Sequence, residues 1–494
     1  MRGRIVTLGA VVALLGLWAA PAVAQPAAGS TPPPAGRPNV LFVAFDDLRP
    51  AIGCFGDPLA KTPNLDRLAA RGVAFTRAYC QQAVCSPSRS SLLTGRRPDQ
   101  TKVWDLKTHF RTALPDVVTL PQLFKQAGYV TEGLGKIYHD GYDDPPSWSE
   151  PSWKPKARGY GPGGAAALAR QQEAFKAAGK DPSAARPLPY ESMDAADDAL
   201  PDGLVANEAV ARLKRHKADG KPFFLAVGFL KPHLPFVAPK KYWDLHDPAK
   251  FKVPAHRELP TGAPKFAGNN SGELRAYATM PAAGPVSDAE AVNLIHGYYA
   301  AASYADAQLG KVLDALDAEG LAGNTVVVVW GDHGWSLGEH GLWCKHTNYE
   351  DAARAPLIVA GPGVPARGAR CDRLVEFVDV YPTLAELAGV PRPDGLAGTS
   401  LAPLLADPAK AWKPAAFSQY PRAIPQKGAG MGYTVRTDRY RLVEWRVKGE
   451  TAAVELYDHQ ADPAETVNLA ADPAHAATVK ELTAMLAAER GRTK

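Results

Sequence analysis

The sequence predicts an α/β protein in which a large, mainly parallel β-sheet is sandwiched between helices, with a smaller antiparallel sheet in a C-terminal subdomain. Two observations support this prediction. Up to about residue 330, nearly continuous apolar runs alternate with segments of helical spacing, which is typical of strands buried on both faces of a parallel sheet. Beyond about residue 407, polar and apolar residues alternate around turn signals, which is typical of antiparallel strands.

Each strand expected in the larger part of the protein follows from an apolar run, and each helix follows from helical spacing of apolar residues. Strands are expected at 39–45, 73–79, 129–135, 223–229 and 325–330, and helices at 63–71, 88–94, 121–127, 203–217 and 291–319. Thr62 and Pro63 are suited to the N-cap and first turn of the helix that follows them. Gly95, Gly128 and Gly320 are suited to helix ends, because glycine adopts the left-handed conformation without a steric penalty.

Two long stretches, 141–200 and 253–285, interrupt this alternation. Both are rich in Pro, Gly, Ala and Asp, and they are too long for simple connections, so we expect insertions that form loops over one face. In the C-terminal part, strands are expected within 432–445 and 455–457, and a helix at 473–489. We therefore expect a catalytic domain at 37–406 and a C-terminal subdomain at 407–494.

The first 24 residues have the layout of a secretory signal. A positive start at Arg2 and Arg4 precedes an apolar run, and small residues end at Ala24, where we expect cleavage. A membrane anchor is the alternative, but the run is shorter than the roughly 20 residues that a span needs. Residues 25–36 are rich in Pro and Ala and indicate a loose leader. We therefore expect an exported protein, periplasmic or extracellular, without stable membrane insertion.

Composition excludes several classes of protein. The chain has 494 residues, 46% of them apolar and 22% charged, which excludes a disordered or fibrous chain. Its formal charge of +5 falls to about +3 if the segment containing Arg2 and Arg4 is removed. This excess is too small to indicate a nucleic-acid partner, although it allows a local basic pocket for a small anion.

The five cysteines do not form a dense disulfide framework, and their pairing stays open: Cys54, Cys80, Cys85, Cys344 and Cys371. Cys85 differs from the others in its context, because it opens the run Cys-Ser-Pro-Ser-Arg at the start of the helix expected at 88–94. Unpaired N–H groups and the positive end of the helix dipole would meet any group held there. This placement favours a nucleophile that faces an anion.

Polar residues follow four of the expected strands directly: Asp46 and Asp47, Lys136 and His139, Lys231 and His233, and Asp332 and His333. Parallel strands bring their carboxyl ends to one edge of a sheet, where ligands bind. Three carboxylates there suit calcium or magnesium, whereas a histidine ligand suits manganese or zinc better. The residues therefore predict metal-assisted chemistry on an anionic group, with the metal's identity left open.

The run Cys85 to Arg89, followed by SSLLTG at 90–95, resembles the hallmark of the type I, formylglycine-dependent sulfatases. Further stretches extend the resemblance over nearly the whole mature chain, and within the family they most resemble the iduronate-2-sulfatases. These stretches are DDLRPAIGCFGD from 46, GKIYH from 135, FFLAVGFLKPHLPF from 223, DHGWSLGEHGLWCKHTNYED from 332, SQYPR from 418 and MGYTVRT from 431. The resemblance implies an alkaline phosphatase/sulfatase-like fold.

The resemblance also implies roles for individual residues. Cys85 would be converted to formylglycine by a formylglycine-generating enzyme. The metal, usually calcium (Ca²⁺) in this family and less often Mg²⁺ or Mn²⁺, would be held by Asp46, Asp47, Asp332, His333 and the modified Cys85. Arg89 and Lys136 would hold the formylglycine oxygens with His139 beside them. His233 and Lys345 would face the sulfate and its leaving oxygen.

The substrate implied by the resemblance is a sulfated saccharide, specifically the 2-O-sulfate of a terminal uronic acid removed in an exo-acting reaction. Candidate substrate contacts are Trp335, His346, Arg422 and Arg436, the last two as cations for the sugar carboxylate. His346 departs from the family pattern. Two alternatives stay open: a phosphomonoester or phosphonate hydrolase of the same superfamily, and a non-catalytic protein that binds sulfated sugars.

Overall fold

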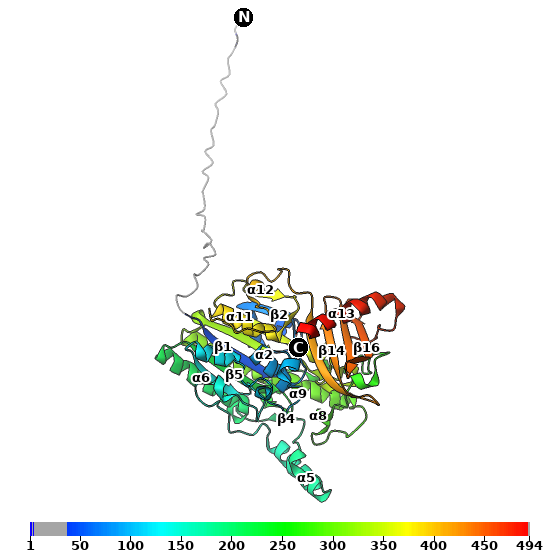
Figure 1. The fold of residues 1–494 in the computed structure, drawn as a ribbon. Helices are drawn as coiled ribbons and strands as arrows, with labels where there is room; N and C mark the ends of the chain where they lie inside the picture. Colours follow the sequence, from blue (N-terminus) through cyan, green and yellow to red (C-terminus); the bar gives the residue numbers. More distant parts are fainter. Residues whose placement is uncertain (2, 4–36, 493–494) are drawn as a thin grey trace. The chain divides into compact units, whose positions relative to one another are not determined.

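The computed structural model describes residues 37–492, together with Met1 and Gly3. Apart from those two residues, the signal segment and leader predicted at 1–36 lie outside the described residues. An eight-stranded sheet forms the centre of the larger part (Figure 1). Its order is β11 (Ala369–Cys371), β2 (Gly72–Tyr79), β10 (Arg354–Ala360), β7 (Thr325–Gly331), β1 (Asn39–Asp46), β5 (Phe223–Pro232) and β3 (Val130–Gly135), with β12 (Val375–Glu376) paired to β2.

The sheet is mainly parallel, as predicted. β1 runs parallel to β5 and β7, β3 runs parallel to β5, and β2 runs parallel to β11 and β12. β10 alone among these strands is antiparallel to its neighbours β2 and β7. β10 is not among the strands expected from the sequence, because Pro356 interrupts its apolar run. The structure accommodates this proline at a register shift between Ala355 and Leu357.

Helices cover both faces of this sheet. In β1, Val40, Phe42 and Ala44 pack into one apolar cluster with helices α2 (Cys85–Thr94), α4 (Leu120–Gln126) and α11 (Val380–Leu387). The alternate residues Leu41, Val43 and Phe45 pack into a second cluster with α1 (Pro63–Ala69), α6 (Pro201–Asp219) and α9 (Asp288–Ala318). A strand buried on both faces needs apolar residues at every position, which explains the continuous run of the sequence.

Two helix starts differ from the prediction. Thr62 is not the side-chain cap of α1, because its hydroxyl accepts the N–H of Gly53. Instead Asp306, from α9, accepts the N–H groups of Asn64 and Leu65 at 3.1 and 2.8 Å. Helix α2 begins at Cys85 rather than at Ser88, so the cysteine is its first residue.

A separate four-stranded antiparallel sheet forms the C-terminal part, as predicted (Figure 1). It is a meander of β13 (Ala416–Ile424), β14 (Gly428–Arg436), β15 (Tyr440–Val447) and β16 (Glu450–Asp458), and α13 (Ala476–Arg492) packs on it. Ser418 and Gln419 of β13 donate hydrogen bonds to the carbonyls of Cys80 and Gln81. These bonds tie the second sheet to the loop that leads into α2. The boundary between 406 and 407 stays a prediction.

The two insertions are not simple loops. The segment 141–200 contains α5 (Pro162–Ala177) and β4 (Tyr190–Met193), which pairs with β6 (Phe236–Pro239). The segment 253–285 contains the short helix α8 (Gly272–Arg275). Among the described residues, no helix combines the length and apolar character that a bilayer span requires.

Candidate active site

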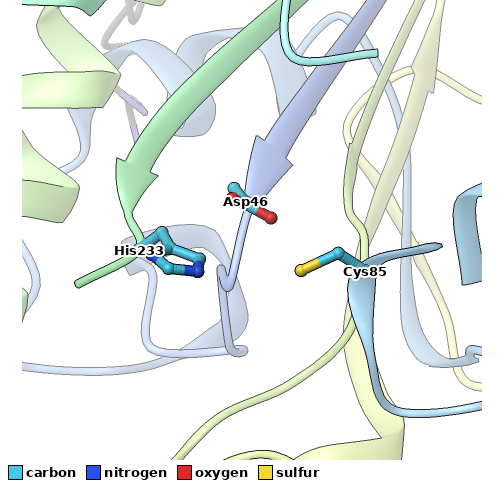
Figure 2. A group of neighbouring side chains, drawn as sticks. All are labelled: Asp46, Cys85 and His233. Carbon is cyan, nitrogen blue, oxygen red and sulfur yellow. The ribbon is translucent and has the colours of Figure 1, made fainter. Parts of the chain in front are cut away.

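The strand ends bring the predicted residues together at one edge of the large sheet. Asp46 is the last residue of β1, Asp332 follows β7, and His233 follows β5. Figure 2 shows Asp46 between Cys85, at the start of α2, and His233. Ligand atoms of these three residues all lie within 4.8 Å of one another. The parallel direction of β1, β5 and β7 produces this convergence.

Three completely buried carboxylates form the floor of the site. Oxygens of Asp46, Asp47 and Asp332 lie within 4.8 Å of one another. Asp47 has a φ of 66°, in the left-handed region that aspartate tolerates better than most residues. Its N–H donates to Asp332 Oδ1 at 2.9 Å, and its carbonyl accepts from Tyr298 at 2.7 Å. These bonds fix the backbone of Asp47, whose carboxylate lies close to that of Asp46.

The same residues fit a divalent cation. Nδ1 of His333 lies 2.9 Å from the carbonyl of Gly334, so Nδ1–H donates there and Nε2 faces inward. That Nε2 lies 3.3 Å from Asp47 Oδ1 and 3.5 Å from Cys85 Sγ. Clustered buried carboxylates need compensating positive charge, and oxygen-rich donor sets suit hard cations such as calcium.

Arg89 and Lys136 surround Cys85 and the carboxylates with positive charge. Arg89 Nε lies 2.8 Å from Asp332 Oδ2 and its Nη2 lies 3.2 Å from Asp46 Oδ1. Lys136 Nζ forms an ion pair with Asp46 and lies 3.8 Å from Cys85 Sγ. Burial and the Asp46 carboxylate raise the pKa of the Cys85 thiol well above its ordinary value, despite Lys136. These surroundings therefore favour the neutral thiol of Cys85 over its thiolate.

Lys345 and His233 both lie against Asp47. Lys345 Nζ lies 3.0 Å from Asp47 Oδ1 and 2.9 Å from Glu273 Oε1. His233 Nε2 lies 3.3 Å from Glu273 Oε1 and 3.7 Å from Asp47 Oδ2. Burial lowers the pKa of His233, but Asp47 and the other carboxylates outweigh burial, so its pKa is raised.

Glu273 is the residue at this site that sequence reasoning missed. It lies on α8, inside the insertion at 253–285, and burial would raise its pKa, but Lys345 and His233 hold that pKa well below its ordinary value. Its Oε2 lies 3.8 Å from His346 Nε2. A single glutamate in a four-residue helix carries no periodicity or motif, so no signal in the sequence distinguishes it.

His139 and Trp335 lie beside these groups in different environments. Burial and Lys136 lower the pKa of His139 to about 4, so its imidazole is neutral at neutral pH. Its Nδ1 is buried and has no hydrogen-bond partner among the described residues. Trp335 was a candidate substrate contact, but it is completely buried and packs beneath Lys345, whose Nζ lies 4.9 Å from the ring centroid. It therefore supports the lysine rather than facing a ligand.

The two candidate arginines have separate environments. Arg422 stacks on Tyr420 at 4.6 Å and donates to the carbonyls of Phe266, Ala267 and His346. It therefore lies next to the Lys345–His346 segment. Arg436 does not join the site, because its Nε pairs with Glu350 at 3.4 Å. That carboxylate also pairs with the buried Arg441, so the Arg436 guanidinium belongs to a structural ion network.

Comparisons with known proteins agree with this geometry. The sulfatase family model matches residues 38–390, and the model for the C-terminal part of N-sulphoglucosamine sulphohydrolase matches residues 338–492. Iduronate 2-sulfatase of Mus musculus is 34% identical, over 90% of this chain and 93% of its own length. The Homo sapiens iduronate 2-sulfatase is 33% identical, over 87% and 90%.

Solved structures give the same fold. The phosphonate monoester hydrolase of Agrobacterium radiobacter superposes with a TM-score of 0.75 at 24% identity, covering 93% of this chain and 96% of that one. At this identity the similarity concerns the fold alone. The family match spans most of the chain and includes the strand ends, α2 and the carboxylates described above. The chain therefore belongs to the sulfatase family and is a sulfuric ester hydrolase.

Proposed function

We propose that the protein hydrolyses the sulfate ester of a sulfated saccharide with a formylglycine nucleophile made from Cys85 and a divalent cation. One observation carries the proposal: Cys85 begins a buried helix directly against three buried carboxylates, with Arg89 and Lys136 around it. The Cys-Ser-Pro-Ser-Arg run at this position matches the family's modification motif. A formylglycine-generating enzyme would act on it during maturation.

The cation would be held by Asp46, Asp47, Asp332 and His333, with residue 85 as a further ligand. We propose calcium, since oxygen donors predominate. A bound divalent cation supplies Lewis-acid activation of the nucleophile and neutralises negative charge on the sulfuryl group. The fixed orientation of His333 and the N–H bond from Asp47 to Asp332 prepare the donor set for that role.

As an aldehyde hydrate, formylglycine at position 85 would supply one hydroxyl that attacks sulfur in place of the sugar oxygen. Deprotonation of its second hydroxyl would break the C–O bond to the bound sulfate, releasing sulfate and restoring the aldehyde. Arg89 and Lys136 would hold the oxygens at residue 85, because their charged groups already lie within reach of that side chain and its carboxylate neighbours. His139 would take the proton of the second hydroxyl. Its neutral imidazole, and an Nδ1 without a hydrogen-bond partner in the part of the chain that the structure describes, support a role as proton acceptor.

His233 and Lys345 would act on the leaving oxygen. As the sulfur–oxygen bond to the sugar breaks, its electron pair stays on the sugar oxygen, which takes a proton from His233 Nε2. The raised pKa of His233 supports its being protonated beforehand. Lys345 would stabilise the negative charge that develops on this side of the sulfuryl group.

For the substrate, we propose the 2-O-sulfate of a terminal uronic acid. The iduronate 2-sulfatases of mouse and human, which match over most of their length, support this class. Arg422 would attract the sugar carboxylate, since its described hydrogen bonds go to carbonyl groups rather than to an acid, and His346 lies beside it. The secretory signal at 1–24 is proposed on sequence grounds alone.

The test is a substrate panel with protein whose formylglycine content has been measured. A uronic acid 2-O-sulfate, its neutral-sugar analogue, and the corresponding phosphate esters are compared by kcat/KM. We expect the uronic acid sulfate to be preferred. Equal values for the two sulfated sugars would remove the uronate assignment, and a preference for phosphate would remove the sulfatase assignment in favour of the phosphoester alternative.

A further inference from the structure

Glu273 connects an insertion of unassigned role to the reacting side of the site. The insertion at 253–285 meets the large sheet's edge through α8, and the Glu273 side chain contacts both residues proposed for the leaving oxygen. Its Oε1 lies 2.9 Å from Lys345 Nζ and 3.3 Å from His233 Nε2. We propose that Glu273 is a positioning residue that orients Lys345 and His233 toward the leaving oxygen; this rests on the proposed function.

The side chain of Lys345 lies between two carboxylates. Asp47 binds its ammonium from the floor of the site at 3.0 Å, and Glu273 binds it from the insertion. A flexible lysine held by one carboxylate could rotate about that contact, whereas two carboxylates and the Trp335 ring below define one position. Removing Glu273 leaves Lys345 with Asp47 alone, so its ammonium would be drawn toward the metal-binding carboxylates and away from the leaving oxygen.

His233 is oriented in the same way. Its Nδ1 lies 2.6 Å from the carbonyl of Leu234, which fixes the ring from behind and leaves Nε2 facing Glu273 and Asp47. The loop that carries His233 is itself held by Lys231, whose Nζ donates to the His233 carbonyl at 2.9 Å. Glu273 provides the closer of the two carboxylate contacts to Nε2.

Glu273 could instead be read as a metal ligand, because it forms a compact group with Asp47 and His233. The ammonium of Lys345 argues against that reading, since it already lies within 3.0 Å of both carboxylates and supplies the positive charge between them. The other Glu273 oxygen, Oε2, is buried without a hydrogen-bond partner among the described residues. It faces His346 Nε2 at 3.8 Å.

A comparison of two leaving groups gives a discriminating test. A sugar alcohol is a poor leaving group and needs protonation, whereas a nitrophenolate leaves without it. Glu273→Gln keeps the shape of the side chain and removes its charge. We expect kcat on a sulfated sugar to fall about 10- to 100-fold, while kcat on 4-nitrophenyl sulfate falls less than about 3-fold. Bound metal, measured by elemental analysis, should be unchanged.

The readout is the ratio of the two kcat values in one preparation, which does not depend on how much of the protein is active. Glu258→Gln is the matched control, because Glu258 is an exposed glutamate of the same insertion, and its ratio should equal that of the wild type. If Glu273→Gln yields no soluble protein, Glu273→Asp withdraws the charge by one methylene and should lower the same ratio.

An unchanged ratio, with equal losses on both substrates or no loss on either, would overturn the positioning role and leave the proposed function intact. Loss of bound metal in Glu273→Gln would also overturn it, since Glu273 would then act as a ligand. Wild-type protein that carries formylglycine but cleaves neither sulfate ester would overturn the proposed function, and this inference with it.

Discussion

Arg89 donates a hydrogen bond from Nε to Asp332 Oδ2 at 2.8 Å, and both side chains are completely buried. The guanidinium also bonds Asp46 and the carbonyls of Lys136 and Ile137. One arginine thus links the ends of β1, β3 and β7 to α2. The residue that compensates the charge of Asp46 and Asp332 is therefore also a structural link between strands.

This relationship gives a stability prediction. Arg89→Ala removes a buried cationic partner from both Asp46 and Asp332, and we expect the free energy of unfolding to fall by about 3–5 kcal/mol. Urea denaturation measures the change. Arg71→Ala is the control, because Arg71 pairs with Asp317 at the surface and should cost less than about 1 kcal/mol. Similar losses for the two variants would contradict the linking role of Arg89.

Cys85 should be found as an aldehyde in active protein. Its position at the start of α2, within the Cys-Ser-Pro-Ser-Arg run, leads to this expectation. Mass spectrometry of the tryptic peptide 78–89 separates the aldehyde from the thiol. Cys85→Ala should abolish turnover while Cys80→Ala, a buried cysteine near the same loop, should retain the aldehyde. Native protein that turns over sulfate esters with residue 85 entirely as a thiol would refute the mechanism.

Removal of the metal should abolish activity. We expect a chelator to stop turnover, calcium to restore it, and Asp332→Asn to lose both bound metal and activity, because Asp332 contributes one of three converging carboxylates. Elemental analysis and turnover are measured on the same samples. Asp306→Asn is a useful comparison, since Asp306 is a buried carboxylate that accepts hydrogen bonds from Asn64 and Leu65 of α1, and this variant should keep its bound metal. Full activity in metal-free protein would disprove the assignment.

Glu465 should make the protein sensitive to acid. Burial would raise its pKa, but Arg441 at 2.6 Å and His459 at 2.9 Å hold the pKa at about 2 in the folded protein. Because the folded pKa lies below the ordinary value of about 4.5, Glu465 stabilises the fold above that pH. This contribution, on the order of 3 kcal/mol, is lost as the pH falls from about 4.5 toward 2.

The measurement is urea denaturation across that pH range in wild type and Glu465→Gln. The variant should be less stable near neutral pH and show a shallower loss of stability on acidification. Parallel curves for the two proteins would show that Glu465 does not carry the acid dependence.

The sequence by itself determined the main architecture and which strand-end residues converge at one edge of the sheet. The continuous apolar run of β1 is required by burial on both faces, so it predicted a parallel sheet covered by helices. The sequence predicts that Asp46, Asp332 and His233 lie together, because each ends a strand or directly follows one, and parallel strands deliver their ends to one edge. Both predictions depend only on residues that are close to one another in the sequence, so local sequence patterns are enough to make them.

Only the tertiary structure decided which residues from distant segments complete these features. Asp306 caps α1 from 242 positions away along the chain, and Glu273 reaches Lys345 across 72. Arg436 has the charge expected of a substrate contact, yet Glu350 holds it in a structural network. Propensity and periodicity describe neighbours in sequence, whereas the partner of a charged side chain is set by how helices and insertions pack around the sheet.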